Sequence, residues 1–239
     1  IRDCLLSRGL GDVYKRQTLT ISILFMTNSN DIPYDVVQFL EKRKHIEIWG
    51  RKLPHWFQEN KTMFVTFRLA DSLPKNKVEE FLANRANMLK EEKRTAGNNT
   101  RKAYDIMMMR KMEYWLNNGY GNCILRREDV RNVLVEALYY YNNKEYLLHT
   151  FVVMPNHVHI LLSSLTNKPI NNIIGKVKGF TTFQLRKSLR IDENIWQKGI
   201  FDRILRNWDE FEKYVDYIAN NPKSLPEDSY SLYIQESIR

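Results

Sequence analysis

Two histidines one residue apart are the first side chains in this sequence whose spacing could support metal chemistry. They stand in FVVMPNHVHILL (151–162), where one apolar run ends at Pro155 and Asn156 and a second begins. Side chains two apart on a strand point to the same face, so His157 and His159 would lie side by side. Two neighbouring imidazoles can hold one metal ion. The alternative is a hydrogen-bonded histidine pair at a sheet edge, and the pattern alone does not decide between them.

A tyrosine and a carboxamide form the second candidate group, in the expected last helix WDEFEKYVDYIANN (208–221). Asn207 is a suitable N-cap, with Glu210 three residues later. At about 100° per residue, Tyr217 falls off the apolar stripe of this helix, and Asn221, four residues on, shares its flank. The alternative for Tyr217 is an aromatic residue at the boundary of the core with its hydroxyl in water. The residues of the stripe are Trp208, Phe211, Val215 and Ile218.

A basic stretch lies between these two groups. Residues 168–190 carry six Lys or Arg residues, no acidic residue, and two interleaved phenylalanines, Phe180 and Phe183. A solvated helix face would mix both signs of charge, whereas one sign with aromatic neighbours suits a nucleic-acid backbone and stacked bases. The residues that we expect to bind nucleic acid, here and elsewhere in the chain, are Arg51, Lys52, Lys176, Lys178, Phe180, Arg186, Lys187 and Arg203.

The overall charge agrees with such a partner. The chain has 239 residues, with 37 Lys and Arg against 28 Asp and Glu, which gives a formal net charge of +9. A chain this basic is a candidate for a phosphate-rich partner, and the alternative is a merely basic soluble protein. With 43% hydrophobic residues the chain can bury one sizeable core.

Cysteine usage and hydropathy indicate the compartment. Cys4 and Cys123 form no pattern, which argues against a disulfide framework or a cysteine-rich zinc site and suits a reducing compartment. No apolar stretch approaches the roughly 20 residues that span a bilayer, so we expect no membrane partner. We therefore expect a cytoplasmic, nucleoid-associated bacterial protein.

The positions of helix and strand patterns predict a mixed fold. We expect a four-stranded, mainly antiparallel sheet with helices packed on one side of it, of the ferredoxin-like α+β class. The expected strands are 62–70, 145–154, 157–164 and 199–206. The expected helices are 33–49, about 74–93, 101–117, 128–141, 169–189 and 208–221.

The start of the chain needs separate treatment. The opening IRDCLLSRGLGDVYKRQ resembles translated adapter or vector sequence, and the first methionine is Met26, so we expect residues 1–25 to be a non-native leader. The remaining expected parts are an N-terminal helical and basic segment at 26–60, a catalytic-type domain at 61–225 with a helical insertion near 95–142, and a C-terminal tail at 226–239.

Four ordered blocks of the sequence, and an entry segment that precedes them, resemble one known family. PNHVHILL, KVKGFTTFQLRK, IWQKGIFDRILRN, EFEKYVDYIANNP and RKLPHWFQENKTMFVTFRLADSLP are similar to blocks of the REP-associated tyrosine transposases. These enzymes are part of the HUH superfamily of single-strand nucleases, which share a His-hydrophobic-His pair and a tyrosine nucleophile. The resemblance covers about residues 50–225, and it is specific because the blocks match in order.

The resemblance implies metal-assisted cleavage of a DNA strand. His157 and His159 would be metal ligands, and Asn221 stands where relatives carry a polar third ligand. Tyr217 would attack the scissile phosphate to form a 5′-phosphotyrosine and a free 3′-hydroxyl. The family precedent favours Mg²⁺ or Mn²⁺, although two imidazoles suit Zn²⁺ or Mn²⁺ better by ligand softness.

The family's usual substrate is single-stranded DNA with a short imperfect hairpin, and the protein would act as a monomer or homodimer. Two alternatives remain open at this point: a domesticated relative that binds hairpin DNA without cutting it, and a zinc hydrolase unrelated to nucleic acid.

Overall fold

The computed structural model describes residues 36–49, 55–95, 107 and 110–238. By its internal contacts the chain divides into residues 1–34 and 35–239, and the described residues belong to the second unit. The expected leader at 1–25 and the predicted nucleic-acid-binding residues Arg51 and Lys52 lie outside the described residues.

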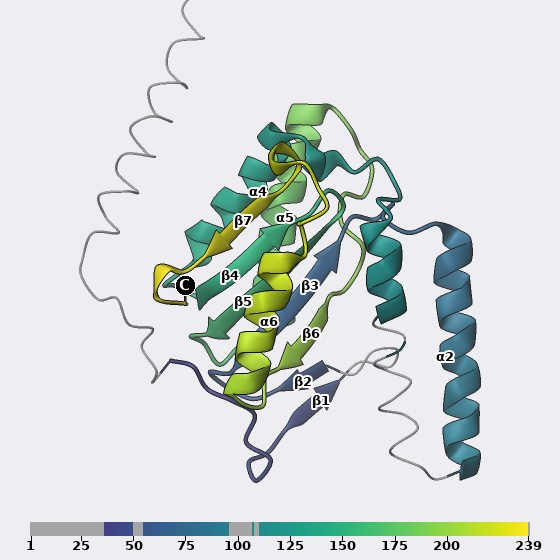
Figure 1. Ribbon diagram of the computed structural model, residues 1–239, viewed down its shortest axis with the longest axis vertical. Helices are drawn as coiled ribbons and strands as arrows, with labels where there is room; N and C mark the ends of the chain where they lie inside the picture. The colour runs from purple at the N-terminus through teal and green to yellow at the C-terminus, as the bar shows by residue number, and fades with distance from the viewer. Residues whose placement is uncertain (1–35, 50–54, 96–106, 108–109, 239) are drawn as a thin grey trace, which may run out of the picture. The chain divides into compact units, whose positions relative to one another are not determined.

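A five-stranded antiparallel sheet is the centre of the described structure (Figure 1). Its strand order is β6-β3-β5-β4-β7, and every neighbouring pair runs antiparallel. The α+β class and the antiparallel sheet are therefore confirmed, and each of the four expected strands is present. The strands are β3 (Thr62–Arg68), β4 (Tyr146–Val153), β5 (His157–Ser164), β6 (Phe201–Ile204) and β7 (Ser231–Ile234).

The fifth strand, β7, falls in the segment that we expected to be a C-terminal tail. It pairs with β4 at the edge of the sheet, and the Thr150 hydroxyl donates to the Tyr233 carbonyl at 2.7 Å. The buried Arg131 side chain also holds this segment, because it donates to the Asp228 carbonyl at 2.6 Å and to the Ser231 hydroxyl at 3.1 Å. A segment of four residues is too short for a strand pattern to be recognised in the sequence. Contacts with distant residues decide that this segment forms a strand.

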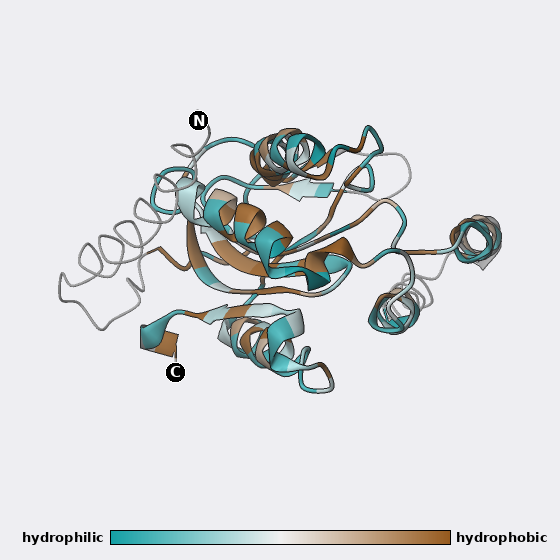
Figure 2. Cartoon of the chain, turned by 90° about the horizontal axis from the view of Figure 1, so that it is seen from above, coloured by the Kyte–Doolittle hydropathy of each residue, from teal (hydrophilic) through white to brown (hydrophobic). Residues whose placement is uncertain are grey.

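Helices cover both faces of the sheet (Figure 2), so the expectation that they lie on one side is wrong. The helices α4 (Glu128–Tyr141) and α5 (Ile170–Leu189) pack on one face, where their apolar residues share a core with Val158, Ile160 and Leu162 of β5. The helix α6 (Trp208–Asn220) packs on the opposite face against β4 and β5. Because side chains alternate along a strand, His157 and His159 point to the face that carries α6.

The segment before β3 differs from the prediction. The expected helix at 33–49 is wrong over the described residues 36–49, which hold turns and the strand β1 (Glu47–Trp49), paired with β2 (His55–Phe57). Apart from one local turn, in which the Lys44 amide donates to the Glu41 carbonyl, the backbone here bonds to distant partners: the Leu40 amide donates to the Leu205 carbonyl at 2.8 Å. The side chain of Gln58 likewise donates to the Glu41 carbonyl at 2.8 Å. These tertiary bonds replace the ladder that a helix would make.

Two further helical segments lie beside the sheet. The helix α2 spans Lys75–Thr95, and residues 110–117 are helical. Leu73, Trp115 and Leu116 form a small buried cluster between the start of α2 and the second segment. Of the inserted helical region expected near 95–142, residues 96–106 and 108–109 lie outside the described residues.

Candidate active site

The histidine pair begins β5 and is fully enclosed. The rings of His157 and His159 lie 4.7 Å apart between centroids, and the side chains are 1% and 3% exposed. The Asn156 amide nitrogen donates to the Leu116 and Tyr120 carbonyls at 3.2 and 3.1 Å, so its oxygen faces His157. His157 Nδ1 lies 2.7 Å from that oxygen and must therefore donate to it. This fixes the tautomer and leaves His157 Nε2 with a lone pair.

No described residue forms a hydrogen bond with that lone pair. His157 Nε2 is buried and makes no hydrogen bond within the part of the chain that the structure describes. A buried polar atom without a partner is costly, and metal-binding histidines commonly donate their other ring nitrogen to a fixed oxygen in this way. The arrangement around His157 leaves Nε2 free to bind a metal ion.

His159 connects the strand to the helix above it. Its Nδ1 lies 2.7 Å from the Thr66 hydroxyl on β3, and its Nε2 lies 3.3 Å from the Tyr217 hydroxyl on α6. The Phe64 ring stacks beside it, with 5.5 Å between centroids. The two side chains that the sequence placed 58 residues apart are thus in contact.

Burial keeps both imidazoles neutral. Desolvation lowers the pKa of His157 to about 3. It also lowers the pKa of His159 well below its ordinary value, and the neighbouring His157 adds to that shift. Neutral imidazole is the form that binds a metal ion, so the pair is ready for one at neutral pH.

The local structure of α6 places Tyr217. Asn207 caps the helix, because its side-chain oxygen accepts from the Glu210 amide at 2.9 Å, as the sequence predicts. Tyr214 stacks on Phe64 with 4.2 Å between centroids, and Tyr217 meets the same ring edge-on at 5.7 Å. One turn of aromatic packing therefore sets the rotation of α6 and directs the Tyr217 hydroxyl toward His159.

Two polar side chains complete the surroundings of the Tyr217 hydroxyl. Burial raises the pKa of the Tyr217 phenol far above its ordinary value. The negative charge of Glu113, and the hydrogen bond between the phenol and the Glu113 carboxylate, raise this pKa further. A hydrogen bond from Asn221 lowers it. The Asn221 amide oxygen is buried and has no hydrogen-bond partner among the described residues. Burial raises the pKa of Glu113 as well, while the bond with Tyr217 opposes that shift.

Sequence reasoning missed Glu113. It lies in the helical segment 110–117, and no spacing relates it to His157 or Tyr217 in the sequence. Its position follows from tertiary contacts. Gly121 has φ +85°, and a Cβ there would lie 2.6 Å from the Asp71 carbonyl oxygen, so only glycine allows this close approach. Together with the bonds from Asn156, this approach holds the segment carrying Glu113 against the end of β5.

Three side chains are candidates to hold a divalent ion. His157 Nε2 and the Asn221 oxygen are both buried without a hydrogen-bond partner in the described structure, and His159 Nε2 belongs to the same cluster through Tyr217. Across the described ranges no group of three or more His, Cys, Asp and Glu residues could hold an ion, and Asn221 is the third ligand that the resemblance implies. Two imidazoles and an amide oxygen are compatible with Mn²⁺ or Mg²⁺.

The predicted nucleic-acid-binding residues of α5 lie on the other face of the sheet. Lys176 pairs with Glu145, and Arg186 donates to the Asp192 carbonyl at 3.0 Å. Lys187 is exposed, and Phe180 is 44% exposed. These residues do not meet the histidine pair, and their role in binding stays a prediction.

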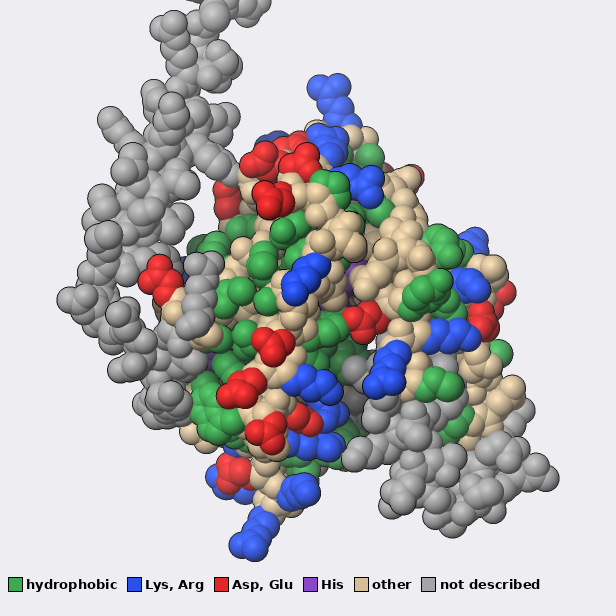
Figure 3. All heavy atoms as spheres, in the orientation of Figure 1, with side chains coloured by type: hydrophobic (Ala, Val, Ile, Leu, Met, Phe, Trp, Pro, Cys, Tyr) green, Lys and Arg blue, Asp and Glu red, His purple; other side chains and the backbone are tan. Residues whose placement is uncertain are grey.

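Two other predicted residues lie closer to β3. Lys178 Nζ donates to the Gln197 and Gly199 carbonyls at 2.6 and 2.9 Å. Arg203 of β6 pairs with Phe64 in the sheet register and forms an ion pair with Glu210 of α6 at 2.5 Å. Figure 3 shows the face that carries α6, where Lys and Arg side chains lie among Asp and Glu side chains instead of forming one continuous basic patch.

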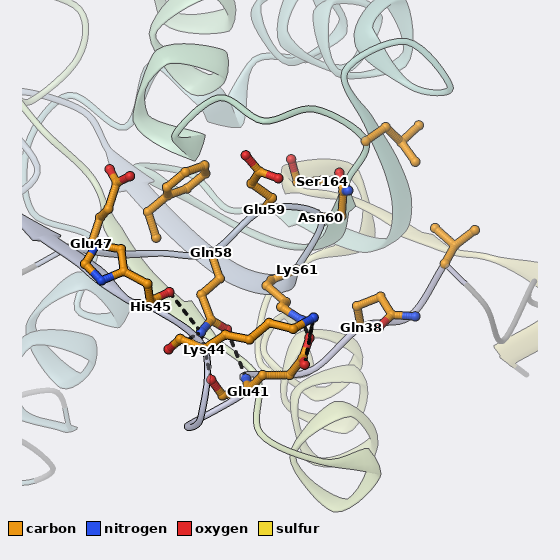
Figure 4. A pocket seen from close by; sticks show the side chains of 13 residues that line it. Gln38, Glu41, Lys44, His45, Glu47, Gln58, Glu59, Asn60, Lys61 and Ser164 are labelled. Atoms are coloured by element: carbon orange, nitrogen blue, oxygen red, sulfur yellow. Dashed lines mark hydrogen bonds and ion pairs between the residues drawn. The ribbon is translucent and has the colours of Figure 1, made fainter.

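A separate pocket lies at the opposite end of β3 and β5 (Figure 4). Its volume is about 900 Å³, and its lining includes Gln58, Lys61 and Ser164. Lys61 Nζ is bound to the Glu41 carboxylate at 2.6 Å, so its charge is satisfied. The pocket shares no lining residue with the histidine–tyrosine cluster.

A family comparison agrees with this geometry. Residues 119–221 match the family described as "Transposase IS200 like", a span that begins shortly after Glu113 and ends at Asn221. The predicted resemblance to a transposase family is confirmed over this span. The matched span contains His157, His159 and Tyr217.

Individual relatives of this transposase-like chain are distant. An uncharacterized protein of Haemophilus influenzae is 26% identical over 94 residues, which are 30% of this chain and 52% of that protein, so the chain spans about half the length of this curated relative. A solved REP-associated tyrosine transposase bound to a REP hairpin is 13% identical, with a TM-score of 0.37, over 77% of this chain and 73% of that one. A putative transposase from Deinococcus radiodurans R1 is 11% identical, with a TM-score of 0.28, over 72% of this chain and 96% of that one.

No helix among the described residues of this transposase-like chain is long and apolar enough to span a membrane.

Proposed function

We propose that this chain is a metal-dependent transposase that cuts and rejoins single-stranded, hairpin-containing DNA through a 5′-phosphotyrosine intermediate. One observation carries the proposal: the Tyr217 hydroxyl lies 3.3 Å from His159 Nε2, beside the His157 ring. A nucleophile and a candidate metal site are thereby brought to one place by two elements of the same chain.

The proposed reaction is a transesterification at phosphorus. The Tyr217 oxygen attacks the scissile phosphate and forms a P–O bond, while the bond from phosphorus to the 3′-oxygen of the neighbouring nucleotide breaks. The Glu113 carboxylate accepts the Tyr217 proton, and the leaving 3′-oxygen takes up a proton to become the free 3′-hydroxyl. The reverse attack by a 3′-hydroxyl rejoins a strand, and no nucleotide cofactor is consumed because the phosphotyrosine bond preserves the energy of the phosphodiester.

The chain's own side chains prepare the phenol. An unactivated tyrosine is a weak nucleophile at neutral pH, and burial makes this one weaker still. The Asn221 amide donates to the hydroxyl and the Glu113 carboxylate accepts from it, so the phenol is oriented and its proton has an acceptor. A bound divalent ion supplies charge stabilisation at a phosphate oxygen, and His157, His159 and Asn221 would hold it.

The direct test is the capture of the covalent intermediate. Hairpin oligonucleotides labelled at either end are incubated with the protein and Mn²⁺ or Mg²⁺ and separated on denaturing gels. We expect a protein–DNA adduct that retains the label 3′ of the cut and disappears in Tyr217→Phe.

Tyr214→Phe is the matched control. Tyr214 lies on the same helix and stacks on the same Phe64 ring, and phenylalanine preserves that stacking while it removes a hydroxyl. We expect Tyr214→Phe to keep the adduct. Hairpin binding without an adduct under any divalent ion would instead indicate a DNA-binding protein that does not cut.

A further inference from the structure

Arg68 stands beside the histidine pair on the neighbouring strand. It is the last residue of β3, and its partner in the sheet register is His157. Residues directly opposite in an antiparallel pair point to the same face, with Cβ atoms about 5 Å apart. Thr66, two residues earlier and opposite His159, shows that this row of β3 faces the site, because its hydroxyl bonds to that ring at 2.7 Å.

The charge of Arg68 has no protein counterpart in the described structure. Its Nη1 donates to the Ser72 hydroxyl at 2.8 Å and, at 3.4 Å, to the Leu69 carbonyl, which are neutral acceptors. No carboxylate among the described residues forms an ion pair with it. Burial lowers the pKa of Arg68 to about 10, and no acidic side chain offsets that shift. A half-buried cation without a counterion is costly, and a ligand anion would remove that cost.

A second cation approaches the same point from α5. Lys178 reaches the loop between α5 and β6 and donates to the carbonyls of Gln197 and Gly199, again neutral acceptors. The same loop touches β3, since the Gln197 amide donates to the Arg68 carbonyl at 2.9 Å. Burial, and then the charge of Arg68, lower the pKa of Lys178 to about 8, so the two cations lie close enough to repel each other.

We propose that Arg68 binds a backbone phosphate of the DNA strand at the cleavage site, with Lys178 reinforcing the positive potential there. This inference rests on the proposed function and adds a strand-binding residue to it. An arginine suits this role because its planar donor group matches a phosphate, and among the described residues only Nη1 has hydrogen-bond acceptors.

The first test measures strand affinity without cleavage. In a Tyr217→Phe background, Arg68→Gln should weaken binding of the hairpin oligonucleotide about 10- to 100-fold, the range for a lost charge-assisted hydrogen bond. The slope of log affinity against log salt should become shallower by about one. Lys144→Gln is the matched control, since it also removes one positive charge, from an exposed residue packed over Tyr140 far from the site, and should change affinity less than 2-fold.

The second test asks whether Arg68 contacts one particular phosphate of the DNA or only supports the structure of the site. Methylphosphonate linkages, which carry no charge, are placed one at a time at the scissile position and at its two neighbours. The parent protein should lose affinity at one of these three linkages, whereas Arg68→Gln should show no further loss at that linkage. Arg68→Lys should recover part of the affinity, and thermal unfolding should show that each variant is folded.

The outcomes distinguish this inference from the proposed function. An adduct in the wild type, together with unchanged hairpin affinity in folded Arg68→Gln, overturns the role of Arg68 and leaves the nuclease intact. If each uncharged linkage lowers the DNA affinity of the parent protein and of Arg68→Gln by the same factor, the role of Arg68 is also overturned. Absence of hairpin binding by the wild type removes both proposals.

Discussion

Replacing Asn156 tests whether the histidine pair is arranged for a metal ion. The Asn156 oxygen accepts from His157 Nδ1 at 2.7 Å, and this bond keeps the lone pair on Nε2. Leucine has the same branched shape, with somewhat larger end groups, and no acceptor. In Asn156→Leu the His157 N–H is therefore left buried without a partner or moves to Nε2, where it blocks the ligand position.

The magnitude follows from that lost bond. An unsatisfied buried donor costs about 1–3 kcal/mol, which is about a 5- to 150-fold change in an equilibrium. Loss of the oxygen that orients a metal-binding histidine typically weakens metal binding by about 10- to 100-fold. We therefore expect Mn²⁺ affinity, measured by the electron paramagnetic resonance signal of the free ion, to fall by one to two orders of magnitude.

Stability needs its own control, because the Asn156 amide also donates to the Leu116 and Tyr120 carbonyls. Thermal unfolding of Asn156→Leu without metal reports that structural loss separately. Asn118→Ala removes a comparable exposed bond to the Tyr114 carbonyl and should leave Mn²⁺ affinity unchanged. A folded Asn156→Leu protein with wild-type Mn²⁺ affinity would refute the assignment of His157 as a ligand fixed by Asn156.

Two further predictions concern stability. Burial lowers the pKa of His149 to about 4. Below about pH 6.5 the unfolded chain therefore binds a proton at His149 that the folded chain does not, and the free energy of unfolding should fall between pH 6.5 and 4. In urea titrations at each pH, His149→Gln should remove up to about 3 kcal/mol of that fall. A pH dependence identical in His149→Gln and wild type would contradict this. Gly121→Ala should destabilise the protein by about 2 kcal/mol or more, because of the 2.6 Å approach to the Asp71 carbonyl at positive φ. Gly175→Ala in α5, where a Cβ meets nothing within 4 Å, should instead stabilise the protein by about 0.5–1 kcal/mol. Equal changes of the unfolding temperature in Gly121→Ala and Gly175→Ala would count against the structural explanation.

Strong periodic patterns were sufficient to predict most of the fold. The strand β5 and the helix α4 have the predicted bounds, and α6 ends one residue before the predicted end. The pairing of His157 and His159 on one face follows from the two-residue repeat of a strand, and the register of β5 with β3 is regular at both histidines.

The sequence could not assign α5 to a face of the sheet. Its unbroken positive charge predicts a nucleic-acid partner, yet its apolar residues pack on the face opposite the histidine pair. Which face a helix covers depends on the path of the chain between strands, and the amphipathic pattern carries no information about that path. Glu113 was missed for a related reason, since only the packing of residues 110–121 brings it to Tyr217.

The connection before α6 is short and anchored. The strand β6 ends at Ile204 and α6 begins at Trp208, and between them the Leu205 amide donates to the Thr62 carbonyl at 2.9 Å. The three connecting residues, with Leu205 fixed to β3, join α6 directly to the edge strand of the sheet. In this structure the Tyr217 hydroxyl therefore lies over the histidine pair of its own chain.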